Sequence, residues 1–132
     1  MIDKQIKNSL FQAQIIGITA HIRPDGDAIG SLLGLGLALI NAGKKVEMVL
    51  RDGVSQSFRH LDGSELIMRE FSSDCDLNVV VDCSDLKRTG GVLDGRKVHI
   101  AIDHHVTNDN FADINLTEPS AVATSEILAE RL

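Results

Sequence analysis

The chain has 132 residues, of which 43% are hydrophobic and 24% are charged, and its formal net charge is −6. This composition is typical of one ordinary globular domain and excludes a disordered chain. Because lysine and arginine supply most of the affinity of proteins for phosphate backbones, the acidic balance argues against a broad nucleic-acid-binding surface. An anionic substrate would therefore need local positive charge, from a few arginines or from metal ions.

The start of the chain has no positively charged segment followed by an apolar one, and only two cysteines occur, Cys75 and Cys83. These features predict a cytoplasmic protein with reduced thiols. The longest apolar run, residues 28–40, is too short to span a bilayer and is typical of a buried helix. We therefore expect no membrane insertion.

The first half of the chain predicts a strand, a loop, a helix and a second strand. Residues 14–20, "QIIGITA", form a short β-branched run, and the apolar residues 28–41 are followed by "AG", a glycine stop. Residues 44–50, "KKVEMVL", alternate well enough for a strand. The following residues 51–73 mix polar turns with a weak amphipathic piece around 64–71.

The second half predicts three more strands and a final helix. The strands are expected within residues 77–85, 96–105 and 111–117. Thr117 is a candidate N-cap for a helix that begins at Pro119 and reaches residue 132. Strands that are apolar on both faces and alternate with helical stretches indicate an α/β fold. We expect a parallel β-sheet of about five strands flanked by helices on both faces, a Rossmann-like three-layer architecture.

Acidic and histidine side chains follow three of the predicted strands. They are His21, Asp25 and Asp27 after the first strand, Asp82 after the third, and Asp103, His104 and His105 after the fourth. Because the carboxyl ends of parallel strands lie along one edge of a sheet, we expect these side chains to meet there. So many carboxylates at close range would raise one another's pKa and cost folding energy, so a cation must hold them.

The mixed oxygen and imidazole set indicates which cation fits. It suits Mn²⁺, with Mg²⁺, Co²⁺ or iron as alternatives, better than a thiolate-rich zinc site. The ligands exceed the coordination shell of one ion, so two divalent cations are predicted. Phosphoester hydrolysis is the chemistry expected of such a dinuclear centre.

Three motifs in order, "HIRPDGDAIGS", "VVVDCSD" and "IDHH", resemble the successive motifs of the DHH phosphoesterases. That superfamily includes RecJ-like exonucleases, nano-RNases that also dephosphorylate 3′-phosphoadenosine 5′-phosphate, cyclic-dinucleotide phosphodiesterases and family II inorganic pyrophosphatases. The runs "DCSDLKRTG" and "SAVATSEIL" are most similar to the nano-RNase branch. The resemblance implies a hydrolase that removes nucleotides from the 3′ end of short single-stranded RNA, dephosphorylates small nucleotides, or does both.

The resemblance also implies a role for each motif residue. His21 and Asp25 would bind one metal, Asp27 and His104 would bind the other, and Asp82 would bridge both.

Two further residues would act around the metals. His105 would face the scissile phosphate, and Asp103 would orient the histidines without binding a metal itself. Arg88 is a candidate substrate contact, because a planar guanidinium suits phosphate.

The chain departs from the family pattern after His105. The family has a later aspartate on the second metal and a separate carboxyl-terminal domain that grips the substrate. We therefore expect residues 1–132 to be a single DHH catalytic domain that is incomplete at its carboxyl end. Its second metal is expected to bind weakly or not at all, and its activity is expected to be impaired. A homodimer of the full-length protein is a further possibility.

Other functions remain open at this point. Within the same superfamily, the alternatives are an inorganic pyrophosphatase or exopolyphosphatase and a cyclic-dinucleotide phosphodiesterase. From other classes, the alternatives are a receiver-like signalling domain phosphorylated on Asp82 and a silent metal-binding or regulatory remnant. A receiver domain has no use for three histidines and ends its last strand with a lysine.

Several residues that attract attention are expected to have structural roles only. His60 lies in a polar turn region, and His99 lies within the fourth predicted strand, where packing or a local hydrogen bond suffices. Gly30, Gly34 and Gly36 lack the order of a nucleotide fingerprint and are expected to allow close packing of the helix on the sheet. The thiol of Cys83 beside a carboxylate is a poor nucleophile.

Overall fold

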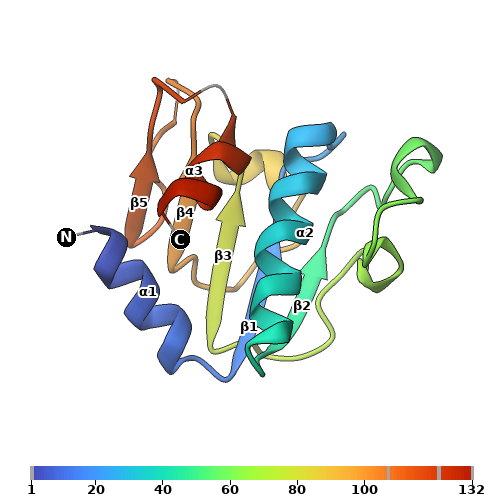
Figure 1. Cartoon of the computed structure of the whole chain (residues 1–132), viewed down its shortest axis with the longest axis horizontal. Coiled ribbons are helices and arrows are strands. Elements are labelled where there is room, and N and C mark those ends of the chain that lie inside the picture. Colours follow the sequence, from blue (N-terminus) through green and yellow to red (C-terminus); the bar gives the residue numbers. More distant parts are fainter. Residues whose placement is uncertain (1, 107, 122, 132) are drawn as a thin grey trace.

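The structure, a computed structural model, describes residues 2–106, 108–121 and 123–131. Its elements follow one another as α1 (Ile2–Gln12), β1 (Ile15–Thr19), α2 (Gly26–Asn41), β2 (Lys45–Val49), η1 (Gln56–Phe58), η2 (Ser64–Leu66), β3 (Leu77–Val81), η3 (Leu86–Thr89), β4 (Ile100–Asp103), β5 (Ile114–Thr117) and α3 (Thr124–Arg131), where η marks 3-10 helices. The strands form one sheet in the order β2-β1-β3-β4-β5, and all four pairings are parallel (Figure 1). The predicted α/β fold with a five-stranded parallel sheet is confirmed.

The order of the strands creates a switch point between β1 and β3. The chain leaves β1 in one direction to form β2 and then returns past β1 to form β3, so the connections after these two neighbours diverge. In open parallel sheets ligands bind in the crevice at such a point, outside the carboxyl ends of the strands. The loops that carry His21 and Asp82 begin at this position.

One face of the sheet is covered by α1, α2 and α3, which lie together in front of the strands in Figure 1. The core on this face includes Ile6 of α1, Leu32 of α2 and Ile127 of α3, packed against strand residues such as Ile18 and Val79. Burial of these aliphatic side chains provides the main stabilisation of the layer. The helices thereby fix where the ends of α2 and α3 lie relative to the carboxyl edge.

The opposite face of the sheet is covered by η3 and the loops around it. A second core on this side contains Val80, Cys83, Leu93 and Val98, with Phe71 packed against it. The weakly amphipathic residues 64–71 do not make a regular α-helix: they give η2 and then a bridge between Met68 and Val49.

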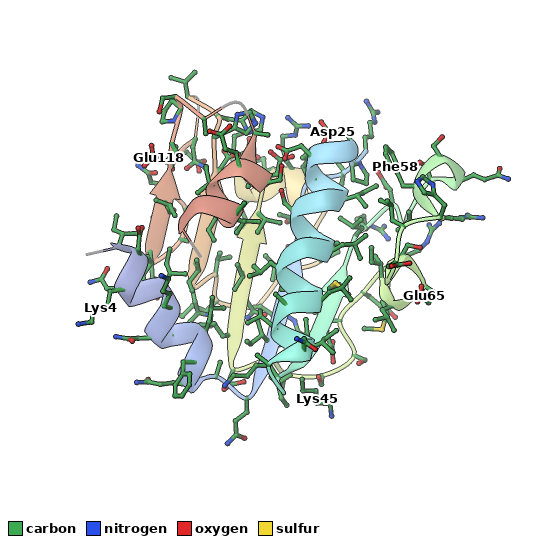
Figure 2. The ribbon with its side chains drawn as sticks, viewed as in Figure 1. Lys4, Asp25, Lys45, Phe58, Glu65 and Glu118 are labelled. Atoms are coloured by element: carbon green, nitrogen blue, oxygen red, sulfur yellow. The ribbon has the colours of Figure 1, made fainter. Side chains whose placement is uncertain are left out.

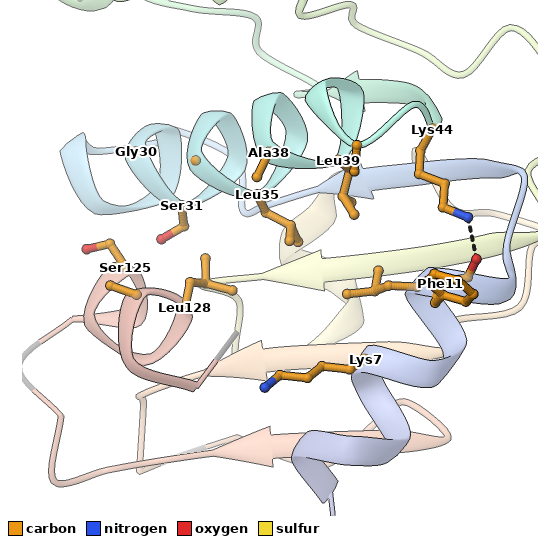
Figure 3. Close-up of a pocket in the computed structure, with 14 residues that line it drawn as sticks. Lys7, Phe11, Gly30, Ser31, Leu35, Ala38, Leu39, Lys44, Ser125 and Leu128 are labelled. Atoms are coloured by element: carbon orange, nitrogen blue, oxygen red, sulfur yellow. Dashed lines mark hydrogen bonds between the residues drawn. The ribbon is translucent and has the colours of Figure 1, made fainter.

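The glycines of α2 differ in role. A Cβ on Gly36 would lie 2.2 Å from the Met48 sulfur, so this glycine allows α2 to pack closely on β2. A Cβ on Gly30 or Gly34 would meet nothing within 4 Å, so the expectation of close packing is wrong for these two. They line a groove of about 430 Å³ between the three α-helices, with Leu128 across from them (Figure 3).

The helix boundaries correct three expectations. Helix α1 is absent from the predicted elements, although Ile2, Ile6 and Leu10 recur at helical spacing and the last two are buried. Helix α2 begins at Gly26 rather than residue 28, because the Asp25 carboxylate accepts a hydrogen bond from the Ala28 N–H and caps it. Helix α3 begins at Thr124 rather than Pro119, because Thr117 is still paired with Asp103 in the sheet. Among the described residues, no helix combines the length and apolarity that a bilayer span needs.

Candidate metal centre

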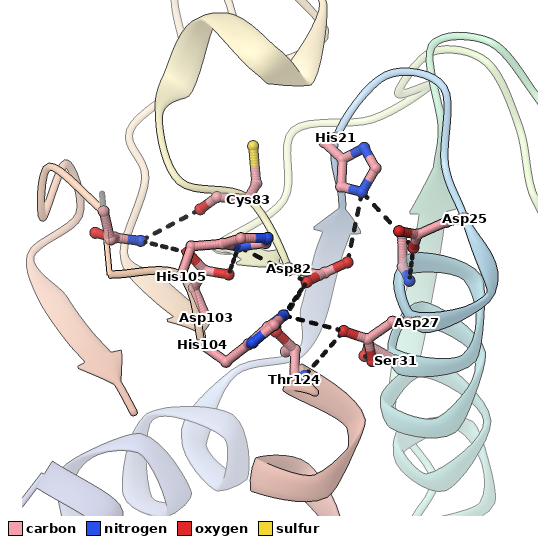
Figure 4. A network of polar contacts seen from close by, with 12 residues as sticks. His21, Asp25, Asp27, Ser31, Asp82, Cys83, Asp103, His104, His105 and Thr124 are labelled. Carbon is pink, nitrogen blue, oxygen red and sulfur yellow. Dashed lines mark hydrogen bonds and ion pairs between the residues drawn. The ribbon is translucent and has the colours of Figure 1, made fainter. Parts of the chain in front are cut away.

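The side chains named by the three motifs converge at the carboxyl edge of the sheet. Three loops and the first turn of α2 deliver His21, Asp25, Asp27, Asp82, His104 and His105 to one place (Figure 4). The structure therefore brings together all the residues that were expected to meet there.

One half of the centre is built by His21, Asp25 and Asp82. The His21 Nε2 lies 3.4 Å from an Asp82 oxygen and 3.8 Å from an Asp25 oxygen. On the other side of the ring, Nδ1 donates to the Ile22 carbonyl at 2.6 Å, which assigns the proton of a neutral ring to Nδ1. The lone pair of Nε2 then faces the two carboxylates, as a metal ligand requires.

The other half is built by His104, Asp27 and again Asp82. The His104 Nε2 lies 3.6 Å from an Asp27 oxygen and 3.6 Å from an Asp82 oxygen. Asp82 belongs to both clusters of potential ligands, one with His21 and Asp25 and one with His104 and His105. It faces the first half with Oδ2 and the second with Oδ1, so its carboxylate lies between the two halves.

Asp82 occupies an unusual position for a carboxylate. Its side chain is almost fully buried, and its backbone has a φ of 53°, in the left-handed region that non-glycine residues rarely adopt. Burial raises the pKa of the Asp82 carboxyl, and repulsion from Asp27 adds to this, although the nearby His21 ring opposes it. The closeness of Asp82 in turn raises the pKa of His21. A strained, buried and destabilised acid of this kind is typical of a functional site.

Asp27 is held by the amino end of α3. The backbone N–H groups of Thr124 and Ser125 donate to its two oxygens at 2.9 Å and 3.0 Å, across 97 and 98 residues of sequence. Burial alone would raise the pKa of Asp27, but these donors outweigh it and the pKa is lowered. The hydroxyl of Thr124 also donates to Asp82 at 3.0 Å. Sequence reasoning missed this threonine, although a threonine that opens a helical segment is a recognisable signal.

His105 and Asp103 form a separate pair beside the metal ligands. The His105 Nδ1 lies 2.5 Å from the buried carboxylate of Asp103, which also accepts from the Asn108 amide at 3.0 Å. The contact with Asp103 anchors the ring at Nδ1, the side chain is 41% exposed, and Nε2 has no hydrogen-bond partner among the described residues. Asn108, which links Asp103 to the Cys83 carbonyl, was not anticipated from the sequence.

The remaining candidates lie outside this cluster. Arg88 lies on η3, and its exposed guanidinium makes no hydrogen bond or ion pair with the described residues; its backbone carbonyl accepts from the Ile22 N–H at 2.6 Å. His60 is exposed, and His99 accepts a hydrogen bond from the Asn78 N–H at 2.9 Å, which agrees with the structural role expected of it.

The donor set fits a divalent cation. The separations between the histidine Nε2 atoms and the carboxylate oxygens, 3.4 to 3.8 Å, are at or beyond the limit of useful hydrogen bonds. Within the described part of the chain, no lysine or arginine pairs with Asp25, Asp27 or Asp82. Oxygen and imidazole donors without thiolate are the ligands that Mn²⁺ and related hard or borderline cations prefer.

Comparisons with known proteins identify the family of this chain. A model of the DHH family, N-terminal domain, matches residues 15–132. A bifunctional oligoribonuclease and PAP phosphatase NrnA from Thermus thermophilus is 34% identical over 122 residues, which cover 87% of this chain and 35% of that protein. The NrnA of Mycoplasma genitalium is 33% identical over 131 residues, covering 93% of this chain and 41% of that protein.

Among solved structures, an exopolyphosphatase-related protein from Bacteroides fragilis superposes with a TM-score of 0.86 at 28% identity, covering 96% of this chain and 41% of that one. The chain thus spans between about a third and two fifths of the lengths of these proteins.

Proposed function

Because this chain belongs to the DHH family, we propose that it hydrolyses phosphoesters with divalent metal ions held at the carboxyl edge of its sheet. The observation that carries the proposal is the position of Asp82, whose two oxygens face two different clusters of ligands. A single carboxylate shared in this way is what a dinuclear centre needs, since both ions then lie against the same substrate phosphate.

The ligands divide between the two ions as follows. His21 and Asp25 hold one ion, Asp27 and His104 hold the other, and Asp82 contacts both. Mn²⁺ is the preferred ion, with Mg²⁺ or Co²⁺ as substitutes. When bound, the ions supply activation of the attacking water and neutralisation of the phosphoryl oxygens.

His105, oriented by Asp103, donates a proton to the leaving group. The buried Asp103 holds His105 by its Nδ1, so the ring cannot rotate and Nε2 points away from Asp103. A protonated Nε2 in this position can donate to the departing oxygen of the substrate, which is the role of a general acid. Asn108 keeps Asp103 in place through its second oxygen.

We propose short oligoribonucleotides and 3′-phosphoadenosine 5′-phosphate as the substrates. The support is the printed description of two relatives as oligoribonuclease and PAP phosphatase, at 34% and 33% identity. A second candidate is a polyphosphate chain, because the structural neighbour is described as exopolyphosphatase-related. Both substrate classes present a phosphoryl group to the same centre.

The test separates metal binding from turnover. The 132-residue chain is incubated with Mn²⁺ and a diribonucleotide, 3′-phosphoadenosine 5′-phosphate or tripolyphosphate, and the products are identified by mass spectrometry. Release of mononucleotide and of phosphate from the two nucleotide substrates supports the proposal, and release from tripolyphosphate alone supports the second candidate. Because the activity of this chain is expected to be impaired, the incubation is prolonged and a chain without added Mn²⁺ is the blank. If a chain that binds Mn²⁺ cleaves none of the three above this blank, the catalytic proposal is wrong.

A variant of His105 sharpens this test. We expect His105→Gln to keep the Mn²⁺ affinity and to lose about 100-fold or more in turnover, the range for a lost general acid. His60→Gln, an exposed histidine outside the centre, is the matched control and should change neither quantity. Loss of Mn²⁺ binding in His105→Gln would instead make His105 a ligand, which its 4.0 Å distance to Asp82 allows.

A further inference from the structure

Three loops at the carboxyl edge of the sheet join beside His21. The loop after β1 donates from the Ile22 N–H to the Arg88 carbonyl of η3 at 2.6 Å. The same loop donates from the Arg23 N–H to the Asp52 carboxylate, which lies just after β2, at 2.7 Å. The ends of three neighbouring strands, β2, β1 and β3, are therefore tied together next to a proposed metal ligand.

Gly90 allows the third of these loops to approach. A Cβ at this position would lie 2.7 Å from both the Arg51 Cγ and the Ile22 Cγ2, so the stem of Arg51 crosses directly over the glycine. Gly90 also has a φ of +74°, which favours glycine. The aliphatic part of Arg51 is thus packed between the loop after β1 and the loop after η3.

Each of the three joined loops carries one exposed arginine. We call Arg23, Arg51 and Arg88 the arginine cluster. None of the three guanidinium groups has a carboxylate partner among the residues that the structure describes. Two acids at the junction bind backbone N–H groups rather than guanidinium groups: Asp52 accepts a hydrogen bond from the Arg23 N–H, and Asp85 accepts one from the Arg88 N–H. Three arginines without a carboxylate partner among the described residues thus lie on loops that adjoin the acidic centre, in a chain whose net charge is −6.

Backbone contacts order the loops that carry this cluster. Arg23 has a φ of 51° and precedes Pro24, a conformation that non-glycine residues rarely adopt and that the Asp52 contact maintains. Arg88 lies in η3, which Asp85 caps. Because the loops are already ordered, little backbone entropy is lost when an anion binds.

The two proposed substrates share one chemical feature that the metal centre does not use. Both a short oligoribonucleotide with a 5′ phosphate and 3′-phosphoadenosine 5′-phosphate contain a nucleoside with one phosphate on each side. If one phosphate lies on the metal ions, the other must be bound elsewhere. Guanidinium groups match a phosphate with paired hydrogen bonds, so an arginine cluster next to the metals suits it.

We propose that the arginine cluster binds the phosphate that is not cleaved, on the far side of the nucleoside attached to the scissile phosphate. This inference rests on the proposed function, and it names the substrate class of the same site: a nucleoside with phosphates at both its 3′ and 5′ positions. It also accounts for one site acting on RNA and on a small bisphosphate, since both offer the same pair of phosphates.

The experiment compares two ligands that differ only in the second phosphate. The ¹⁵N-labelled chain with Mg²⁺ is titrated with 3′-phosphoadenosine 5′-phosphate and with adenosine 3′-monophosphate, and binding is followed by amide and arginine Nε–H resonances. We expect the bisphosphate to bind about tenfold more tightly, the effect of a charged hydrogen-bonded contact. Equal affinities for the two ligands in the unchanged chain would overturn the inference.

Variants at two positions, Arg51 just after β2 and Lys45 at its start, distinguish a specific phosphate site from a general effect of charge. Arg51→Gln should remove the preference for the bisphosphate and leave the affinity for adenosine 3′-monophosphate unchanged. Arg51→Lys, which keeps the charge but not the planar guanidinium, should retain only part of the preference. Lys45→Gln makes the same change of charge at the other end of β2. Figure 2 shows Lys45 and Asp25 at opposite edges of the sheet, so the preference for the bisphosphate should survive this change. If Arg51→Gln keeps the preference, or Lys45→Gln loses it, the cluster is not the phosphate site.

Failure of this inference can be told from failure of the proposed function. A chain that binds Mn²⁺ and cleaves the substrates but shows no bisphosphate preference overturns the inference alone. A chain that cleaves nothing but prefers the bisphosphate through Arg51 overturns the proposed function and leaves the phosphate site standing.

Discussion

Strand β3 has the same two residue types at each end, Cys75 and Asp76 before it and Asp82 and Cys83 after it, yet the two aspartates lie in opposite environments. Asp76 is exposed at the amino edge and accepts hydrogen bonds from the Gln14 N–H at 3.0 Å and the Ile15 N–H at 2.6 Å. These donors lower the pKa of Asp76. Asp82 is buried at the carboxyl edge, and burial raises its pKa.

The difference separates a stabilising carboxylate from a functional one. At neutral pH, ionised Asp76 satisfies two backbone donors at the start of β1, those of Gln14 and Ile15, so it favours the folded state. Ionised Asp82 is buried near Asp27 with no lysine or arginine partner in the described part of the chain, so it disfavours the folded state. A bound cation would offset this cost, so the position of Asp82 supports the proposed metal site.

The largest expected effect comes from Asp82→Asn. Substitution of partners behind metal ligands already costs about 10–100-fold in affinity, so loss of a bridging ligand should lower Mn²⁺ affinity by about 100-fold or more. Without metal at pH 7, the free energy of unfolding should stay the same or rise, because the variant removes a carboxyl whose folded-state pKa is raised. Calorimetric Mn²⁺ titration and urea unfolding in a chelator measure the two quantities.

Asp74→Asn is the control for this pair of measurements, because Asp74 is exposed and lies near the amino edge. It should change neither quantity. The functional assignment of Asp82 fails if Asp82→Asn keeps Mn²⁺ affinity, or if the metal-free variant is less stable than the unchanged chain by more than about 1 kcal/mol, the net worth of one ordinary hydrogen bond.

The two cysteines extend the comparison and should differ in reactivity. Cys83 is 2% exposed, and burial raises the pKa of its thiol to about 12. Cys75 is only half-buried, although burial and then Glu47 raise the pKa of its thiol as well. Because the thiolate is the reactive form, iodoacetamide at pH 8 should label Cys75 at least about tenfold faster than Cys83.

Mass spectrometry of peptides after timed labelling gives the two rates. In urea both cysteines should react at similar rates, which shows that the fold causes the difference. Equal rates in the folded chain would mean that the core behind the carboxyl edge opens readily, contrary to its packing around Val80 and Leu93.

The sheet and the convergence of the motifs could be predicted because they depend on local patterns. Short β-branched runs such as "IIGIT" and "LNVVV" form parallel strands, and parallel strands bring their carboxyl ends to one edge. His21, Asp82 and His104 then meet without any knowledge of side-chain packing. Their roles as metal ligands stay predictions.

The contacts that hold the centre in place could not be predicted in the same way. The bonds from Thr124 and Ser125 to Asp27 join residues about a hundred positions apart, and they depend on how α3 packs against α2. The arginine cluster depends on Gly90, whose missing side chain matters only once Arg51 lies above it. Tertiary packing decides such contacts, and a single sequence carries no direct signal for them.

The smallest expected effect is that of Asp76→Asn on the free energy of unfolding. The pH dependence of this effect tests directly whether Asp76, unlike Asp82, stabilises the fold through its charge. Two N–H groups lower the folded-state pKa of Asp76, so its contribution to stability is present above the ordinary aspartate pKa of about 3.9 and is lost as the pH falls through the folded value. The side chain is exposed and solvent weakens the contact, so the loss at pH 7 should be about 0.5–1 kcal/mol. Urea unfolding at pH 7 and near pH 3 should show the difference between the variant and the unchanged chain shrinking toward zero. A deficit that stays constant with pH would show that the shape of Asp76, and not its charge, stabilises the start of β1.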